Sequence, residues 1–328
     1  MSARANPLVS VVIPCYNYGQ YLPECLQSIF GQEGGYSFEI IALDDASQDN
    51  TLDVLERFKD SRLRVIRHPR NMGHIYTMSE GLAEAQGEFV ARIDPDDRYR
   101  PYFFSTVIPK LEAYPEVGLA YGDAALIDSR GNNTMPCCDE EHKGKDFKGS
   151  EFVRLLFKNF ICAPTAMARR QAWLEALPLP PKLAFNDWYF NLMIARRHEF
   201  YYVDRVVADY RVHQQNHHVK IIADRSEEPS IVWVLDRVFG LDAAENGAGR
   251  QIGRIRPRVY GAQYLTLANK YFVAGMNPDA RRCYIEAIRR HPGYLLSAAS
   301  RRLAATFVSR AAYDRCRGWW RGRMAGMS

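Results

Sequence analysis

The sequence predicts an α/β protein in which helices flank a mostly parallel β-sheet, with a helical extension at the C-terminal end. Four apolar runs in the first 125 residues are continuous rather than alternating, as expected for strands that are buried on both faces. Segments long enough for helices separate these runs, and this alternation favours a doubly wound sheet. Beyond about residue 222 the pattern becomes wholly helical.

The first strand of the sheet is expected near the N-terminus, and further strands are expected to alternate with helices along the chain. Its expected strands are residues 8–13, 38–43, 63–67, 89–93 and 117–121. The first expected helix spans residues 21–30, because Leu22, Cys25, Leu26 and Ile29 recur at helical spacing.

The later segments have less regular secondary-structure patterns. Asp49, Asn50 and Thr51 precede a second helical pattern and are typical of a capped start. Residues 126–182 are less regular, with a helix expected over 150–160. Residues 178–181 have the sequence Pro-Leu-Pro-Pro and are expected to form a rigid connector, after which we expect a helix to begin near Asn186.

The length of 328 residues exceeds the usual size of a single domain, so we expect a large first domain over residues 1–220 and an appendage over 221–328. Hydrophobic residues at 47% and charged residues at 25% are ordinary values for a globular protein. The chain has no run of 18 apolar residues, and the apolar run near its start is too short for a signal peptide. We therefore expect a soluble protein that is not exported.

The seven cysteines indicate a reducing compartment. Their number is odd, and no two of them have Cys-x-x-Cys spacing, which argues against both a disulfide framework and a zinc site. A cytoplasmic protein fits these features, with attachment to the inner face of the cell membrane as a further option.

The net charge of +5 originates in the C-terminal region. Between Arg281 and Arg323 there are eleven arginines, no lysine and two acids, which gives +9 and leaves −4 for the rest of the chain. Residues 294–323 place apolar side chains on one helical face with arginines turned away, a pattern typical of an interfacial helix near anionic lipid. A solvated basic helix packed on the rest of the protein is an equal alternative. Nucleic acid is not an expected partner, because the chain has no recognised fold for it.

Residues 261–292 match one tetratricopeptide-like unit, with aromatic and small residues at the expected offsets. Because we find a single unit, we expect it to cap the first domain rather than to form a peptide-binding array.

Polar clusters follow three of the expected strands. The first strand leads into Pro14, Cys15, Tyr16 and Asn17, the second into Asp44 and Asp45, and the fourth into Asp94, Pro95, Asp96 and Asp97. Ligands of open α/β sheets bind outside the carboxyl ends of the strands. An aspartate pair alone is also a common helix cap, but three acids in four residues repel one another unless a cation or a donor lies among them. Such oxygen ligands suit Mg²⁺ or Mn²⁺, which in turn suits a diphosphate.

The order of these clusters resembles that of family 2 glycosyltransferases of the GT-A (Rossmann-like) fold. The matching segments are VSVVIPCYN at 9–17, LDDASQDNT at 43–51, NMG at 71–73, GEFV at 87–90 and DPDD at 94–97. The resemblance runs from about residue 8 to residue 215, with all motifs in family order.

The resemblance implies a site for a nucleotide-diphospho-sugar donor. Residues 8–125 would bind this donor, and residues 126–220 would supply the acceptor side and the catalytic base. The implied nucleotide contacts are Pro14, Cys15, Tyr16, Asn17, Asp44, Asp45, Asn71, Gly73, Asp94 and Asp96. The implied metal ligands are Asp96, Asp97 and His213.

Two downstream segments extend the resemblance. Phe185-Asn186-Asp187-Trp188 is similar to the acid-aspartate motif that supplies the catalytic base, although Asn186 stands where the family usually has an acid. The YRVH segment at 210–213 is similar to the Tyr-Arg-x-His motif, in which the histidine or a neighbour closes over metal and diphosphate. Residues 214–218 are polar and are a candidate lid.

These parts together predict an inverting glycosyltransferase that uses a metal ion and Asp187 as general base. The donor is expected to be a UDP-sugar, and the acceptor a hydroxyl of a glycan or of a lipid-linked glycan.

Two other functions compete with this prediction. A sugar-phosphate nucleotidyltransferase shares the sheet and the metal but would carry a glycine-rich basic loop after the first strand. A non-catalytic scaffold would use the C-terminal helices to bind a partner. A dehydrogenase is disfavoured because no Gly-x-Gly-x-x-Gly follows any strand.

Overall fold

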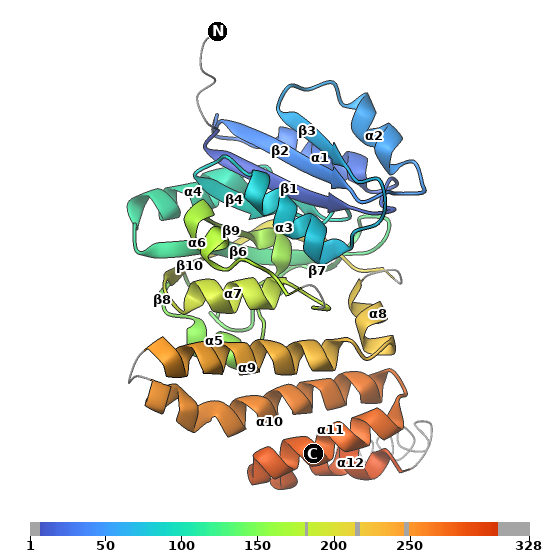
Figure 1. Ribbon diagram of the computed structural model, residues 1–328, viewed down its shortest axis with the longest axis vertical. Coiled ribbons are helices and arrows are strands. Elements are labelled where there is room, and N and C mark those ends of the chain that lie inside the picture. The colour runs from blue at the N-terminus through green and yellow to red at the C-terminus, as the bar shows by residue number, and fades with distance from the viewer. Residues whose placement is uncertain (1–6, 181–182, 214–216, 246–248, 308–328) are drawn as a thin grey trace, which may run out of the picture. The chain divides into compact units, whose positions relative to one another are not determined.

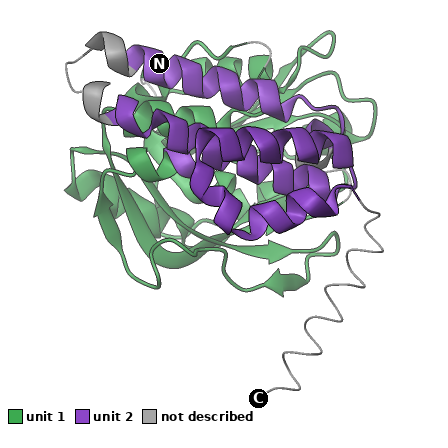
Figure 2. Cartoon of the chain, turned by 90° about the horizontal axis from the view of Figure 1, so that it is seen from below, with its two compact units in different colours: residues 1–155, 159–216 green, residues 156–158, 217–328 purple. Residues whose placement is uncertain are grey.

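The computed structural model describes residues 7–180, 183–213, 217–245 and 249–307. Contacts within the chain divide it into two compact units (Figure 2). The first unit comprises residues 1–155 and 159–216, and the second comprises residues 156–158 and 217–328.

The first unit is built on a mixed, mostly parallel sheet of ten strands (Figure 1). The main path runs β3-β2-β1-β4-β9-β6-β10-β5, while β7 pairs with β6 and β8 with β10. The strands that begin the chain are β1 (Val9–Cys15), β2 (Phe38–Asp44), β3 (Leu63–Arg67), β4 (Phe89–Arg92) and β6 (Val117–Ile127). These five strands confirm the expected ones.

Helices cover both faces of this sheet, as the doubly wound prediction requires. They are α1 (Leu22–Phe30), α2 (Thr51–Arg57), α3 (His74–Glu84) and α4 (Phe103–Ala113). Alternate residues of β1, such as Val11, join the core formed by α1 and α4. On the other face α3 approaches β1 closely, since a Cβ added at Gly81 would lie 2.4 Å from Val12 Cγ1.

Further strands and helices complete the first unit around the longer β6. They are β5 (Arg98–Tyr99), β7 (Asn133–Met135), β8 (Phe147–Gly149), β9 (Ala166–Arg169), β10 (Glu199–Arg211), α5 (Phe152–Phe157), η1 (Ala163–Thr165), α6 (Arg170–Glu175) and α7 (Asp187–Ala195). The helix expected over 150–160 is therefore shorter than predicted. Strand β9 lies antiparallel between β4 and β6, and β10 runs parallel to β6.

The second unit is helical, as the pattern beyond residue 222 predicts. Its elements are α8 (His217–Ala223), α9 (Glu227–Glu245), α10 (Gly249–Val273), α11 (Asn277–Arg290), η2 (Pro292–Leu296) and α12 (Ala298–Ala305). Helices α10 and α11 pack together through buried side chains that include Leu267 and Tyr284. Whether this pair is a tetratricopeptide unit stays a prediction. Among the described residues, no helix has the length and apolarity needed to cross a membrane.

Candidate active site

The sheet register brings the polar clusters to one edge. Cys15 at the end of β1 pairs with Asp44 at the end of β2, which pairs in turn with Arg67 at the end of β3. On the other side of β1, Val12 pairs with Arg92, the last residue of β4. The segments that follow these four parallel strands therefore emerge side by side, as in other open α/β sheets.

The loops after β1 and β2 are bound to each other. The Asn17 backbone N–H donates to Ser47 Oγ (3.0 Å), and the Gln48 N–H donates to Asn17 Oδ1 (2.7 Å). Asn17 has a φ of 60°, a left-handed conformation that asparagine tolerates better than most residues. Tyr16 and Asn17 are exposed at this edge, whereas Pro14 and Cys15 are buried as the last residues of β1.

Asp45 is held by the turn that contains Asn71 and Gly73. Its Oδ1 accepts from the Met72 N–H (2.7 Å) and its Oδ2 from the Gly73 N–H (2.9 Å). His68 Nδ1 also lies 2.7 Å from Asp45 Oδ1, while His68 Nε2 lies 2.6 Å from a carboxylate oxygen of Glu80. The motifs at 43–51 and 71–73 thus form one assembly, in which the neighbouring Asp44 caps the Ser47 N–H (3.2 Å).

The charge state of His68 follows from these contacts. Burial alone would lower the pKa of His68, but its hydrogen bonds to Asp45 and Glu80 raise the pKa above its ordinary value. An imidazolium between two carboxylates is a favourable arrangement. Sequence reasoning missed this residue, because a lone histidine after a strand carries no distinctive pattern.

The acidic cluster after β4 folds into a tight turn in which the Asp97 N–H donates to the Asp94 carbonyl (3.0 Å). Asp96 is 5% exposed and Asp97 only 1%, whereas Asp94 is partly exposed. Asp97 Oδ1 accepts from the Arg211 N–H (2.8 Å). Within the described part of the chain, the buried Asp97 Oδ2 has no hydrogen-bond partner.

The end of β10 lies against this cluster. The Arg211 guanidinium is buried, donates through Nε to the Asp96 carbonyl (2.7 Å) and through Nη2 to Glu24 Oε2 (2.7 Å). His213 Nε2 lies 3.0 Å from Asp96 Oδ2, and its ring stacks on Tyr21 with centroids 5.2 Å apart. The tertiary fold therefore joins the YRVH and DPDD segments. The expected lid at 214–218 begins with residues 214–216, which lie outside the described residues.

The electrostatics of the cluster favour a bound cation. Burial, followed by the charge of Asp94, raises the pKa of Asp96 to about 6. Burial, followed by the charges of Asp96 and Asp94, raises the pKa of Asp97 well above its ordinary value. In the described segments, no three His, Cys, Asp or Glu side chains are already placed as a metal centre. Even so, the unpartnered oxygen of Asp97 and the mutual repulsion of the acids fit a divalent ion.

Asp187, the residue expected to act as base, is the first residue of α7. Its Oδ2 accepts from Asn159 Nδ2 (2.8 Å). Burial, followed by the charge of Asp97 and by smaller effects that include the charge of Asp187, raises the pKa of the Cys162 thiol well above its ordinary value. The preceding Asn186 accepts a hydrogen bond from Arg92 at the end of β4.

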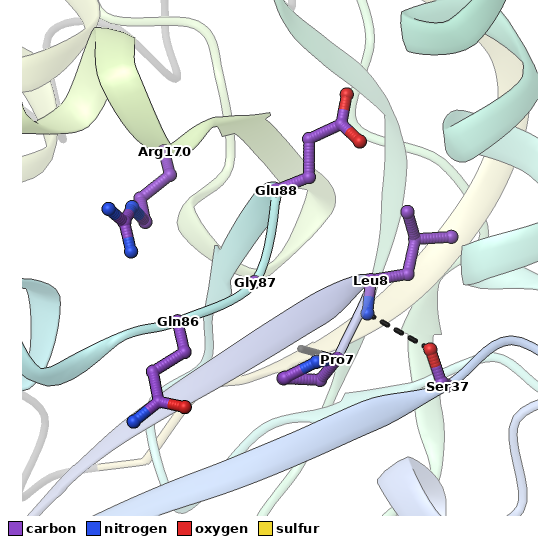
Figure 3. A pocket seen from close by; sticks show the side chains of 7 residues that line it. All are labelled: Pro7, Leu8, Ser37, Gln86, Gly87, Glu88 and Arg170. Atoms are coloured by element: carbon purple, nitrogen blue, oxygen red, sulfur yellow. Dashed lines mark hydrogen bonds between the residues drawn. The ribbon is translucent and has the colours of Figure 1, made fainter. Parts of the chain in front are cut away.

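A pocket also lies at the opposite edge of the sheet, where β1 and β4 begin (Figure 3). It is lined by Pro7, Leu8, Ser37, Gln86, Gly87, Glu88 and Arg170. Gly87 and Glu88 belong to the GEFV motif, but the lining contains none of the predicted nucleotide, metal or catalytic residues, and the strand ends that the pocket faces are the amino ends.

Comparison with known proteins agrees with the geometry. The sequence profile of the family described as Glycosyl transferase family 2 matches residues 10–177, just over half of the chain. An uncharacterised glycosyltransferase of Haemophilus influenzae is 37% identical over 257 residues, which cover 72% of this chain and 76% of that protein. This protein therefore belongs to glycosyltransferase family 2.

Solved structures identify the fold as GT-A. The crystal structure of S. aureus TarS 1-349 in complex with UDP-GlcNAc has a TM-score of 0.62 at 16% identity, over 91% of this chain and 89% of that chain. The mannosyltransferase PcManGT from Pyrobaculum calidifontis, in complex with GDP-Man and Mn²⁺, has a TM-score of 0.57 at 18% identity, over 92% of this chain and 81% of that chain. At these identities the likeness concerns the fold.

Proposed function

We propose that this protein is an inverting glycosyltransferase that transfers a sugar from a UDP-sugar to a hydroxyl of a glycan or of a lipid-linked glycan. The observation that carries the proposal is the convergence of Asp45, the cluster of Asp94, Asp96 and Asp97, and Asp187 at one edge of the sheet. The solved relatives bind UDP-GlcNAc or GDP-Man, which supports a nucleotide-sugar donor.

The donor nucleotide would lie along the carboxyl ends of β1, β2 and β4. Asp45 is bound to the strand end that leads into the exposed Tyr16 and Asn17, since its N–H donates to the Cys15 carbonyl (2.9 Å), and it is assigned to the nucleobase. The turn at 71–73 keeps the Asp45 carboxylate in place through two backbone N–H groups. Asp94, which is more exposed than its neighbours, is available to the ribose.

Asp96, Asp97 and His213 would hold Mg²⁺ or Mn²⁺. When bound there, the ion supplies positive charge next to the diphosphate that leaves. His213 meets Asp96 directly at present, so binding would require this contact to be shared or opened.

Asp187 is the proposed general base. Its carboxylate accepts the proton of the acceptor hydroxyl while that oxygen forms a bond to the anomeric carbon of the donor. The bond from this carbon to the diphosphate oxygen breaks at the same time, and the nucleoside diphosphate departs with the electron pair. A single displacement of this kind inverts the anomeric centre. Asn159 orients Asp187 by donating to its Oδ2, which leaves the other oxygen for the acceptor.

Two observations disfavour the competing functions. A nucleotidyltransferase would place basic side chains in the loop after β1, but this loop carries Tyr16 and Asn17 and is bound to an acidic neighbour, since the Gly19 N–H donates to Asp49 Oδ2. A non-catalytic scaffold has no need for buried carboxylates of raised pKa such as Asp96 and Asp97.

The second unit is proposed to reach an anionic membrane surface. The expected segment is 294–323, of which residues 308–323 lie outside the described residues. Within the described part, Leu295 and Leu296 are exposed, the latter by 95%, and Arg301 is also exposed. Apolar side chains beside arginines favour contact with anionic lipid. This would place the protein at the inner face of the cell membrane.

A thermal-shift screen tests the proposed function. The protein is heated with UDP, GDP or dTDP, each with Mn²⁺ and with a chelator. A ligand at 100 times its dissociation constant stabilises the native state by about 2.7 kcal/mol, which is readily measured. We expect UDP with Mn²⁺ to give the largest shift. The absence of a shift with every nucleoside diphosphate would contradict the proposal.

A further inference from the structure

Arg92 is a charged residue in a strand that is otherwise apolar. It is the last residue of β4, and it is 5% exposed. A buried guanidinium costs free energy unless partners offset its lost hydration. Within the described residues its Nε has no hydrogen-bond partner, so its two terminal nitrogens carry its hydrogen bonds. Because burying this guanidinium costs free energy, its place next to the acidic cluster indicates a specific role.

The two terminal nitrogens of Arg92 reach different parts of the site. Nη1 donates to Asn186 Oδ1, on the residue directly before Asp187. Nη2 lies 3.4 Å from Asp94 Oδ2, in the acidic cluster. The guanidinium therefore bridges the donor side and the acceptor side. Its planar shape suits this bridge, because its nitrogens hold a fixed relative geometry.

The bridge continues beyond Asn186. Asn186 Nδ2 lies 3.1 Å from His74 Nε2, and His74 is the first residue of α3. The N–H of the preceding Gly73 donates to Asp45. Contacts therefore run from the proposed nucleobase site, through α3 and Asn186, to Arg92 and Asp94. In the described part of the chain no side chain caps the start of α7, so the Asn186 contacts hold that end of the helix together with the hydrogen bond from Asn159 to Asp187.

We propose that Arg92 is a positioning residue that fixes the start of α7, and with it Asp187, relative to Asp94, and that its charge weakens the binding of a divalent cation by the acidic cluster. The proposal rests on the proposed function, because it assigns Arg92 a role toward the base and metal ligands named there. Both effects follow from one guanidinium: its hydrogen bond to Asn186 acts on α7, and its charge acts on the acids.

Two substitutions separate these effects. Asn186→Ala removes the attachment of α7 but leaves the charge of Arg92 among the acids. Arg92→Met removes both at similar volume. Arg169→Met is the matched control, since Arg169 is likewise an arginine in a strand, is partly buried, and bonds to backbone carbonyls, including that of Val117 (3.0 Å), away from the site.

The test uses full-length protein and two readouts other than activity: hydrogen exchange of the backbone amides of α7, and Mn²⁺ affinity from titration of the free ion. In Asn186→Ala we expect α7 exchange to rise about tenfold or more, because a hydrogen bond to a charged group is lost, with Mn²⁺ affinity unchanged. In Arg92→Met we expect the same rise and about tenfold tighter Mn²⁺ binding, because a nearby positive charge is gone. The control should change neither.

Unchanged α7 exchange in a folded Arg92→Met protein would overturn the positioning role, and unchanged or weaker Mn²⁺ binding would overturn the electrostatic one. If Arg92→Met does not fold, Arg92→Lys replaces it. This variant keeps the charge, so it should leave Mn²⁺ affinity unchanged and still raise α7 exchange, since an ammonium cannot bridge both partners; normal α7 exchange in it would overturn the positioning role.

The same experiments distinguish an error in the proposed function from an error in the role of Arg92. If wild-type protein binds no Mn²⁺, the metal assignment and the electrostatic role of Arg92 are both wrong, while hydrogen exchange still decides its positioning role. If Mn²⁺ binds but no sugar is transferred, the proposed reaction is at fault and both readouts on Arg92 stand.

Discussion

Replacing Asp187 by asparagine separates its proposed chemical role from its structural one. Asp187 is the first residue of α7, and its Oδ2 accepts from Asn159 Nδ2 (2.8 Å). An asparagine keeps the shape of the side chain and an oxygen that can accept this hydrogen bond. It cannot take a proton from an acceptor hydroxyl at neutral pH. The substitution therefore removes the base while preserving the local packing.

The expected magnitudes of the two roles differ enough to be told apart. As an acid in the first turn of a helix, Asp187 stabilises the helix by about 0.3–1 kcal/mol through its interaction with the helix dipole. As a general base it would contribute about 10² to 10⁴ in rate, which corresponds to roughly 2.7 to 5.4 kcal/mol of activation free energy. Asp187→Asn should thus reduce the free energy of unfolding slightly and slow transfer severely.

The assay is single-turnover transfer with the cognate donor and acceptor, together with calorimetric binding of the nucleotide in the presence of Mn²⁺. Nucleotide binding should be unchanged, because Asp187 lies outside the motifs assigned to the donor. Asp53→Asn is the control, since Asp53 is also an acid in the first turn of a helix, α2, where its side chain is exposed. Near wild-type turnover of Asp187→Asn would refute the assignment, and Glu175 or Asp204 would then be examined as the base.

Three further predictions follow from the site and the second unit. UDP should raise the melting temperature more with Mn²⁺ than with chelator, and Asp97→Ala should abolish this difference; equal binding of UDP by wild-type protein in chelator would show that the metal role is wrong. Because hydrogen bonds raise the pKa of His68 in the folded state, its contribution to the free energy of unfolding is fully present below about pH 6.5 and is lost as pH rises through the folded pKa. Urea unfolding at several pH values should show this loss in wild-type protein and a flatter profile in His68→Asn, and parallel profiles would contradict it. Full-length protein should sediment with anionic vesicles and dissociate from them as salt rises, whereas truncation after Pro292 should abolish sedimentation and keep nucleotide binding. Equal sedimentation of the truncated and full-length proteins would contradict this prediction.

Local sequence patterns were sufficient to predict five strands and to predict the edge of the sheet at which the acids lie. A continuous apolar run such as that of β1 records burial on both faces, whatever the strand pairs with. Parallel strands then carry their carboxyl ends to one edge, so Asp45 and Asp97 had to emerge together once the sheet was parallel. The order of motifs added the family.

The later part of the sheet was not predictable in the same way. Strand β9 is only four residues long and follows a 3-10 turn, so it has no alternation that a pattern could detect. Strand β10 is 13 residues long, but polar and charged residues such as Asp204 and Arg205 interrupt its apolar pattern. Its pairing with β6 shifts register near Val206, and such irregularities leave no mark in the sequence.

The sequence by itself determined the fold class, the family and the chemical types present at the site, because periodicity and motif order are properties of neighbouring residues. Only the tertiary structure decided which side chains meet. Arg92 and Asn186 are 94 residues apart in the chain, and Asp96 and His213 are 117 apart. Contacts of this kind depend on how helices and strands pack rather than on local propensity. For this reason the partners of Asp45, the unpaired oxygen of Asp97 and the bridge through Arg92 became visible only in the folded protein.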